Sequence, residues 1–276
     1  AGLFAALKGR EGWAFVGTFA TIAFAVVSYF GALFPNAMPS SLGSVNDLTL
    51  LAASSTPKTL TIMTWAAVVF TPVVDVALPG GGGPLGDRTF SDDPATVTAY
   101  GQVYVDAIQA AGLLPVLKHF PGHGSGEANS HDGPVGTPPI ESLRTRDLLP
   151  FEALATDTPV GVMVGHLNVP GLSGTTPASI SPAAYDLLRD ELGFDGLAVS
   201  DSLSMGAIAG TIPPESAVVQ TIAAGADLAL FVTIADPAAA ITALEQAAAD
   251  GILPATRIDE AVTRVLAAKG VDPCSL

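Results

Sequence analysis

The chain has few positive charges, few charges of any kind and a single cysteine. Its 276 residues include 11 lysines and arginines against 26 aspartates and glutamates, which gives a net charge of −15. Proteins that bind nucleic acid or anionic membrane surfaces need basic patches, so the composition argues against both kinds of partner. The one cysteine, Cys274, excludes an internal disulfide and a cysteine metal cluster. It does not fix the compartment.

Hydrophobic residues make up 49% of the chain and charged residues 13%, which predicts a large core with little disorder. The residues from Trp13 to Phe34 carry no charge, and such a stretch is long enough for a transmembrane helix. Glycine, threonine and serine interrupt it, however. We interpret it as two buried strands of a parallel sheet, which also read as continuous apolar runs, so no integral membrane span is expected.

Short apolar runs alternate with helical patterns, an order that favours βα units and a parallel sheet. Strands are expected at residues 13–16, 22–27, 67–74, 114–119, 160–165, 197–201 and 227–232. Helices are expected at residues 94–111, 182–192, 216–224, 238–250 and 257–269. The sequence therefore predicts an α/β fold with a single (β/α)₈ TIM-type barrel over residues 1–276, although only seven of its eight strands are found.

Three of the four histidines lie between Lys118 and His131, in the segment Lys-His-Phe-Pro-Gly-His-Gly-Ser-Gly-Glu-Ala-Asn-Ser-His. An apolar run precedes this segment, so a strand is expected to end in a cation and an imidazole and to open into a glycine-rich loop. Asp75, His166 and Asp201 also end predicted strands. Reactive residues of α/β barrels lie at the carboxyl ends of the strands, so the pattern predicts an active site there.

The segment at residues 118–124 resembles the Lys-His-Phe-Pro-Gly-His-Gly motif of glycoside hydrolase family 3, in its bacterial β-N-acetylglucosaminidase (NagZ-type) branch. Three more blocks match in the family's order, namely Phe-Thr-Pro-Val-Val-Asp-Val at 70–76, Gly-Asp-Arg-Thr-Phe at 86–90 and Val-Ser-Asp-Ser-Leu-Ser-Met at 199–205. The resemblance implies a retaining exo-β-N-acetylglucosaminidase. Such an enzyme removes terminal β-linked N-acetylglucosamine from peptidoglycan-derived fragments or related glycosides through a covalent glycosyl-enzyme.

The resemblance also implies roles for single residues. Asp201 matches the family's nucleophile, which attacks the anomeric carbon. His131 matches the general acid and base of this branch, and imidazole titrates near neutral pH, as both roles require. Asn129 stands where the family has an aspartate, so it can orient His131 but supplies no charge. Roles in the substrate site, with His166 as support at its floor, are implied for Arg88, Lys118, His119, Asp75, His166 and Met205.

Three of these residues also have an ordinary structural explanation. Taken alone, Asp201 at a strand-to-helix junction fits a helix cap better than a nucleophile, and only the resemblance reverses this preference. A loop histidine such as His131 is usually a solvated polar residue. Arg88 could form a salt bridge with Asp87 or Asp75.

No cofactor and no metal is expected, because the histidine spacings of 4, 8 and 35 match no common zinc pattern. We expect a small carbohydrate as substrate, a monomer, and a location in the bacterial cytoplasm or the cell envelope, with the compartment open. Two alternatives stay open as well. One is a phosphorylase that uses inorganic phosphate as acceptor, and the other is a catalytically impaired sugar-binding homologue.

An N-terminal strand and one substrate-binding loop of the family have no counterpart in the sequence. The family's loop follows a strand, whereas here residues 25–27 run straight into 28–31. We prefer the explanation that the sequence joins segments across missing stretches, because a barrel without a strand would expose unpaired backbone groups. This explanation predicts chain breaks or abnormal Cα spacing near residues 18–24 and 27–29.

Overall fold

The computed structural model describes residues 36–38, 48–49, 71–80, 83–155 and 159–272. The chain divides into two units, Ala1–Val69 and Phe70–Leu276. In the first unit, β1 (Asn36–Met38) pairs antiparallel with β2 (Leu48–Thr49). The candidate site lies in the second unit.

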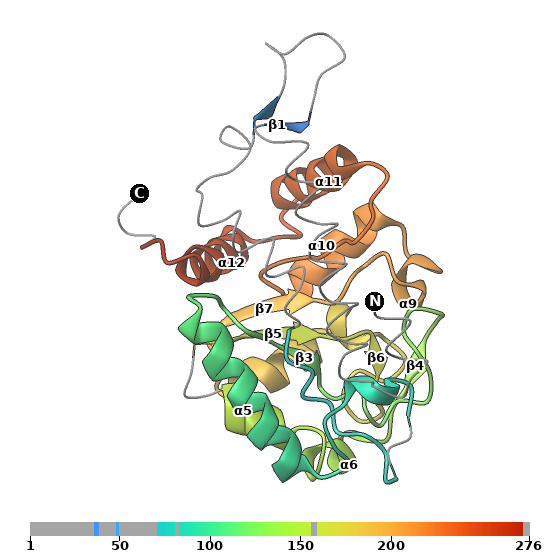
Figure 1. Cartoon of the computed structure of the whole chain (residues 1–276). Coiled ribbons are helices and arrows are strands. Elements are labelled where there is room, and N and C mark those ends of the chain that lie inside the picture. Colours follow the sequence, from blue (N-terminus) through green and yellow to red (C-terminus); the bar gives the residue numbers. More distant parts are fainter. Residues whose placement is uncertain (1–35, 39–47, 50–70, 81–82, 156–158, 273–276) are drawn as a thin grey trace, which may run out of the picture. The chain divides into compact units, whose positions relative to one another are not determined.

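A parallel sheet with the strand order β3-β5-β7 forms the centre of the second unit (Figure 1). Its strands are β3 (Val116–Phe120), β5 (Gly161–Val164) and β7 (Leu197–Ser200). Single parallel bridges add a segment at each edge, since Val73 pairs with Lys118 and Leu228 pairs with Val199. A second, smaller parallel sheet joins β4 (Val135–Gly136) to β6 (Leu167–Asn168).

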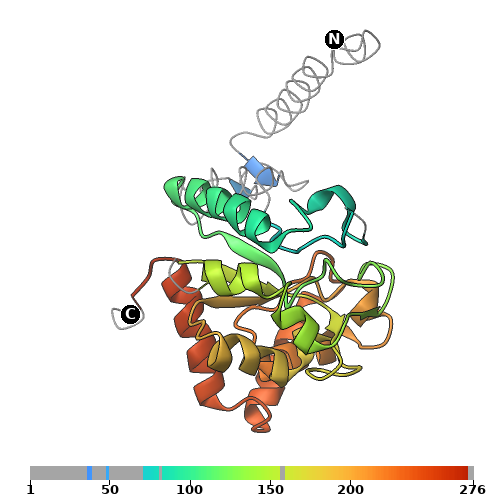
Figure 2. The ribbon, with the colours of Figure 1, turned by 90° about the horizontal axis from the view of Figure 1, so that it is seen from below.

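Helices flank the central sheet, with α5 beside its β3 edge and α10 and α12 beside its β7 edge (Figures 1 and 2). The α-helices are α5 (Pro94–Ala110), α6 (Ile140–Arg144), α7 (Leu149–Ala155), α8 (Pro182–Asp186), α9 (Gly206–Ala209), α10 (Pro214–Ala224), α11 (Pro237–Ala249) and α12 (Ala255–Ala268). A π-helical turn, η4 (Leu187–Glu191), continues α8, and the 3₁₀ turns are η2 (Gly86–Arg88) and η3 (Ala178–Ile180).

Local sequence explains where the longer helices begin. The side chain of Asp93 accepts a hydrogen bond from the amide of Thr96 at 2.9 Å, and Pro94 occupies the first helical position of α5. Asp236 caps α11 in the same way. Such caps satisfy amide groups that have no partner inside the helix, and proline fits the first turn because its missing N–H is not needed there.

The core lies between the sheet and these helices. Leu117, Phe120 and Val162 are fully buried, and Phe120 meets Phe151 of α7 edge to face with ring centroids 5.4 Å apart. At Gly101 of α5 a Cβ would come within 2.8 Å of a methyl carbon of Leu154 in α7. The absence of a side chain at Gly101 therefore lets α5 approach α7 closely.

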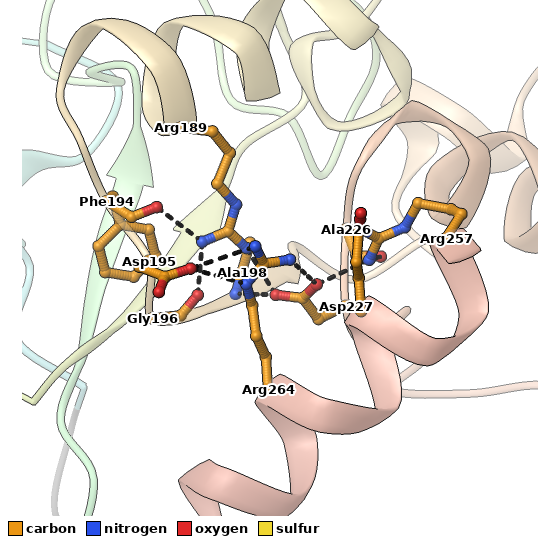
Figure 3. A network of polar contacts seen from close by, with 10 residues as sticks. Arg189, Phe194, Asp195, Gly196, Ala198, Ala226, Asp227, Arg257 and Arg264 are labelled. Atoms are coloured by element: carbon orange, nitrogen blue, oxygen red, sulfur yellow. Dashed lines mark hydrogen bonds and ion pairs between the residues drawn. The ribbon is translucent and has the colours of Figure 1, made fainter.

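A network of charges ties the start of β7 to α12 and η4 (Figure 3). The side chain of Asp227 is fully buried, and its carboxylate accepts hydrogen bonds from Arg189 at 2.6 Å, Arg257 at 2.7 Å, Arg264 at 3.4 Å and the amide of Ala198 at 2.9 Å. Buried charges need partners of this kind, because an unpaired ion in the interior is strongly unfavourable. The network fixes three elements around one carboxylate.

The structure confirms an α/β fold with a parallel sheet and most of the expected elements. The predicted helices correspond to α5, α8 with η4, α10, α11 and α12, and three predicted strands correspond to β3, β5 and β7. The strand predicted at 227–232 is shorter than expected, because it forms a single bridge, at Leu228. Of the strand predicted at 67–74, residues 67–70 lie outside the described ranges, and the described part forms a single bridge at Val73. The short helices α6, α7 and α9 were not predicted.

Several predictions fall on residues outside the described ranges. They concern the strands at 13–16 and 22–27, the uncharged stretch at 13–34, and the chain breaks near 18–24 and 27–29. Closure of the sheet into an eight-stranded barrel stays a prediction as well. Within the described ranges, no helix combines the length and the hydrophobicity needed to cross a membrane.

Candidate active site

Asp75 anchors the loop that follows β3. Its buried carboxylate accepts hydrogen bonds from the amide of His119 at 3.1 Å and the amide of His123 at 2.6 Å, and it lies 2.7 Å from Nδ1 of His119. Burial by itself would raise the pKa of Asp75, but the ion pair with His119 and the contacts with His123 outweigh burial and lower the pKa below its usual value. Both oxygens of Asp75 are thus engaged by the loop, and not by Arg88.

The Pro-Gly-His-Gly turn depends on its glycines. Gly122 has a φ of 132°, and a Cβ there would lie 2.4 Å from the Cβ of Asp147. At Gly124 a Cβ would lie 2.0 Å from the carbonyl oxygen of Val76, the residue after Asp75. Only glycine permits this close approach of two main chains. Gly122 therefore lets the loop after β3 pack against Asp147, and Gly124 lets it pack against the segment that carries Asp75.

Arg146 and Asp147 bond to the same loop, and Arg146 also bonds to the segment that follows Asp75. The hydroxyl of Ser125 donates to the carboxylate of Asp147 at 2.8 Å, and Arg146 donates to that hydroxyl at 2.6 Å and to the carbonyl of Ala77. Burial raises the pKa of Asp147 to about 6, and the contacts with Ser125 and Arg146 offset this only in part. We did not predict this support from the sequence. The only signal for it in the sequence is the charged pair directly before the apolar run at 148–151.

Lys118 lies near three other charged groups, namely Arg88, Asp201 and Asp75. Lys118 is half-buried in the middle of β3, and Arg88 is exposed at the end of η2. Burial lowers the pKa of Lys118, and the charge of Arg88 acts in the same direction, whereas the carboxylates of Asp201 and Asp75 oppose the shift. Arg88, Asp201 and Asp75 are therefore each close enough to Lys118 to influence its charge.

Asp201 follows β7 directly and is 9% exposed. Its amide donates to the carbonyl of Val164 in β5 at 2.9 Å, and its Oδ1 accepts a hydrogen bond from the amide of Ser202 at 2.8 Å. The next helix, α9, begins only at Gly206, and Asp201 is not its cap. The structure therefore does not support the helix-cap explanation of this aspartate.

His166 fixes the turn that follows Asp201. Its Nε2 lies 2.8 Å from the carbonyl oxygen of Ser202, and its Nδ1 lies 2.7 Å from the hydroxyl of Ser179. Burial lowers the pKa of His166, and the charge of Asp201 opposes this only in part. A neutral ring with its proton on Nε2 satisfies both contacts, because Nε2 then donates to the carbonyl and Nδ1 accepts from the hydroxyl.

Beyond β7, serine hydroxyls continue the pairing between this strand and the segment at 228–232. The hydroxyls of Ser200 and Ser202 accept hydrogen bonds from the amides of Leu230 and Val232, each at 3.0 Å. The hydroxyl of Ser204 lies 2.7 Å from that of Ser202. Ser202 thus contacts Asp201 through its amide, His166 through its carbonyl, and the 230–232 segment through its hydroxyl. The alternating serines in Val-Ser-Asp-Ser-Leu-Ser-Met were the missed signal for this pairing.

His131 lies in an exposed loop that contacts the segment after Asp201. The carbonyl of His131 accepts a hydrogen bond from the amide of Gly206 at 3.1 Å, directly after the buried residue Met205. Oδ1 of Asn129 accepts from the main-chain amide of His131 at 3.1 Å. Asn129 was expected to orient His131, and in the structure it bonds to the backbone of that residue and not to the ring.

The comparison with known proteins agrees with this geometry. Residues 25–268 match the family model for the N-terminal domain of glycosyl hydrolase family 3. The chain belongs to glycoside hydrolase family 3. The motifs at residues 70–76, 86–90, 118–124 and 199–205, on which the resemblance was based, all lie inside the matched range.

Relatives and solved structures extend this result. The beta-hexosaminidase LpqI of Mycobacterium tuberculosis is 50% identical over 210 residues, which cover 74% of this chain and 54% of that protein. The solved structure of M. tuberculosis LpqI matches with a TM-score of 0.70 over 74% of this chain and 62% of that chain. The beta-N-acetylglucosaminidase/beta-glucosidase of Cellulomonas fimi is 40% identical over 217 residues, which cover 74% of this chain and 38% of that protein.

A solved family 3 beta-N-acetylglucosaminidase from Paenibacillus sp. str. FPU-7 matches with a TM-score of 0.69 at 35% identity, over 73% of this chain and 39% of that chain. The chain thus spans about half or less of the length of the curated relatives described above.

Proposed function

We propose that this protein is a retaining exo-β-N-acetylglucosaminidase on a closed (β/α)₈ barrel. Its substrates would be glycosides with a terminal β-linked N-acetylglucosamine, such as peptidoglycan-derived fragments. The observation that carries the proposal is the placement of Asp201. This carboxylate follows β7 of the central sheet, caps no helix, accepts one hydrogen bond from Ser202 and interacts with the charge of Lys118. The names of the relatives support the same substrate class.

Asp201 and His131 divide the chemistry between them. Oδ1 of Asp201 is held by the amide of Ser202, and we assign the attack on the anomeric carbon to Oδ2. As the bond from Oδ2 to this carbon forms, the bond to the leaving oxygen breaks, and protonated His131 gives its proton to that oxygen. His131 then takes a proton from water, which displaces Asp201 and yields a product with the original β configuration.

The remaining residues bind the sugar or hold the residues that do. His119 bonds to Asp75 through Nδ1, so its Nε2 is the nitrogen we assign to a sugar hydroxyl. Arg88 and Lys118 supply further donors, and Met205 lines the site beside the Ser202 turn. Donors that bond to sugar hydroxyls can stabilise the transition state by strengthening as it forms.

Asp75 and His166 are better assigned as positioning residues than as direct ligands. Both oxygens of Asp75 and both ring nitrogens of His166 already contact protein atoms. We also keep the proposals of a single catalytic domain over residues 1–276, a monomer and a reaction without a cofactor.

Hydrolysis of an aryl β-N-acetylglucosaminide tests the function. Proton NMR during turnover should show β-N-acetylglucosamine as the first product, with the α anomer appearing only by later mutarotation. The rate should be the same with and without phosphate. Formation of a sugar 1-phosphate would identify a phosphorylase instead. Calorimetric binding of N-acetylglucosamine without any turnover would identify a sugar-binding homologue.

A further inference from the structure

The loop of His131 is docked on the segment that carries Asp201. The amide of Gly206 donates to the carbonyl of His131 at 3.1 Å, and the amide of Ala207 donates to the carbonyl of Ser130 at 3.2 Å. A Cβ at Gly206 would lie 2.7 Å from the carbonyl oxygen of His131 and 3.0 Å from the carbonyl carbon of Asp132. Any side chain at this position would therefore force the loop outward.

The backbone of Gly206 does not itself require glycine. Its φ is not among the positive values found at other glycines, so an alanine would be unstrained there if the loop were elsewhere. The need for glycine at position 206 comes from the loop alone. Glycine at position 206 therefore serves the docking of the loop, and not the conformation of the main chain at that position.

The loop has few other contacts that fix its position. Glu127, Ala128, His131 and Asp132 are exposed. On its inner side, Nε2 of His123 lies 3.3 Å from the hydroxyl of Ser130. The remaining bonds that involve Asn129, to the amides of His131 and Asp132, are internal to the loop. At the base of the loop, the amide of Glu127 donates to the carbonyl of Gly136 at 3.0 Å. The two amides of α9 join the main chain at Ser130 and His131 to the segment after Asp201, and the contact with His123 holds Ser130 on the inner side.

The segment that receives the loop is internally bonded. The amide of Ser202 bonds to Asp201, and the amide of Met205 bonds to the carbonyl of Ser202 at 3.0 Å. We propose that Gly206 is a positioning residue, which sets the distance between His131 and Asp201 by letting the loop of His131 dock on the main chain of the nucleophile's own segment. This inference rests on the proposed function.

Gly206→Ala tests the inference, with Gly133→Ala as a matched control. Gly133 lies in the same loop, a Cβ there meets nothing within 4 Å, and its φ is not positive. Displacement of a catalytic group by about 1 Å can cost about 100-fold in rate. Gly206→Ala should therefore lose about 100-fold in kcat/KM for alkyl glycosides, whose leaving group needs the acid, whereas Gly133→Ala should change little.

An activated substrate gives the readout that a general structural defect would not give. A dinitrophenyl glycoside needs little protonation, so Gly206→Ala should still form the glycosyl-enzyme at nearly the wild-type rate. Hydrolysis of the glycosyl-enzyme needs His131 as the base and should become slow in Gly206→Ala. Dinitrophenolate should therefore be released in a burst, followed by slow turnover. Azide, which needs no base, should speed turnover of Gly206→Ala by about 10-fold or more and should not speed that of wild type.

Ser130→Ala is the second variant and removes only the contact with His123. Ser130→Ala should also lose more kcat/KM for alkyl glycosides than for the dinitrophenyl glycoside, but the loss should be smaller than in Gly206→Ala. Thermal unfolding of all three variants verifies that they fold. Equal losses for both substrate classes, or values for Gly206→Ala that match Gly133→Ala, would overturn the docking role alone. Absence of a glycosyl-enzyme in the wild-type protein would overturn the proposed function together with it.

Discussion

The carboxylate of Asp227 should be the most costly single charge to remove from the described part of the chain. Its side chain is fully buried, and the side chains of its arginine partners are 15% exposed at Arg189 and Arg257 and 22% exposed at Arg264. Replacing it by the isosteric amide in Asp227→Asn leaves these guanidinium groups without their shared counter-ion. Removing one partner of a buried ion pair costs about 3–5 kcal/mol.

Thermal unfolding measures this cost. For a domain of this size, about 1 kcal/mol corresponds to a change in Tm of about 2–4 °C, so Asp227→Asn should lower the Tm by about 6–20 °C. Asp195 provides the control, because it bonds to Arg264 but its side chain is 94% exposed. Exposed pairs contribute about 1 kcal/mol or less, so Asp195→Asn should lower the Tm by about 4 °C at most.

Salt separates the two variants further. Screening weakens exposed pairs more than buried ones. The effect of Asp195→Asn should vanish at about 1 M salt, whereas that of Asp227→Asn should persist. If Asp227→Asn lowers the Tm no more than Asp195→Asn does, the burial argument is wrong.

Two further predictions concern protons. Because the pKa of Asp147 is raised from 3.8 to about 6 in the folded protein, its ionisation costs stability as the pH rises through this window. The free energy of unfolding of Asp147→Asn, measured with urea, should therefore rise relative to that of wild type by up to about 3 kcal/mol between pH 4 and pH 7. A difference between the two proteins that does not change with pH would contradict the assignment. In Asn129→Asp, the fall of kcat/KM at alkaline pH should move to higher pH, because a nearby carboxylate favours imidazolium at His131. A fall that stays in place or moves to lower pH would show that this charge does not act on the acid.

The sequence was sufficient to predict where the proposed site residues lie along the strands. Asp75, Lys118, His166 and Asp201 each follow an apolar run, and the structure places each of them at or just beyond a β segment. This prediction succeeds because central parallel strands bury both faces and read as continuous apolar runs. The long helices were predictable for a related reason, since their caps and first-turn prolines are local signals.

Contacts between distant residues were not predictable. The bond from Ser125 to Asp147 and the dependence of Gly206 on the loop of His131 join residues that no local pattern connects. The short helix α9 has only four residues, too few for a helical period to be visible in the sequence. Asn129 was expected to orient the ring of His131, but it bonds to the main-chain amide of that residue, and a sequence cannot tell a bond to the backbone from a bond to the ring.

The central claim is that Asp201 forms a covalent bond to the sugar. A fluorinated N-acetylglucosaminide with a good leaving group should trap this intermediate, and peptide mass spectrometry should then find one added glycosyl mass on the peptide that contains Asp201. Asp201→Asn should remain unlabelled and lose nearly all turnover. A label on another carboxylate, or wild-type turnover by Asp201→Asn, would contradict the account.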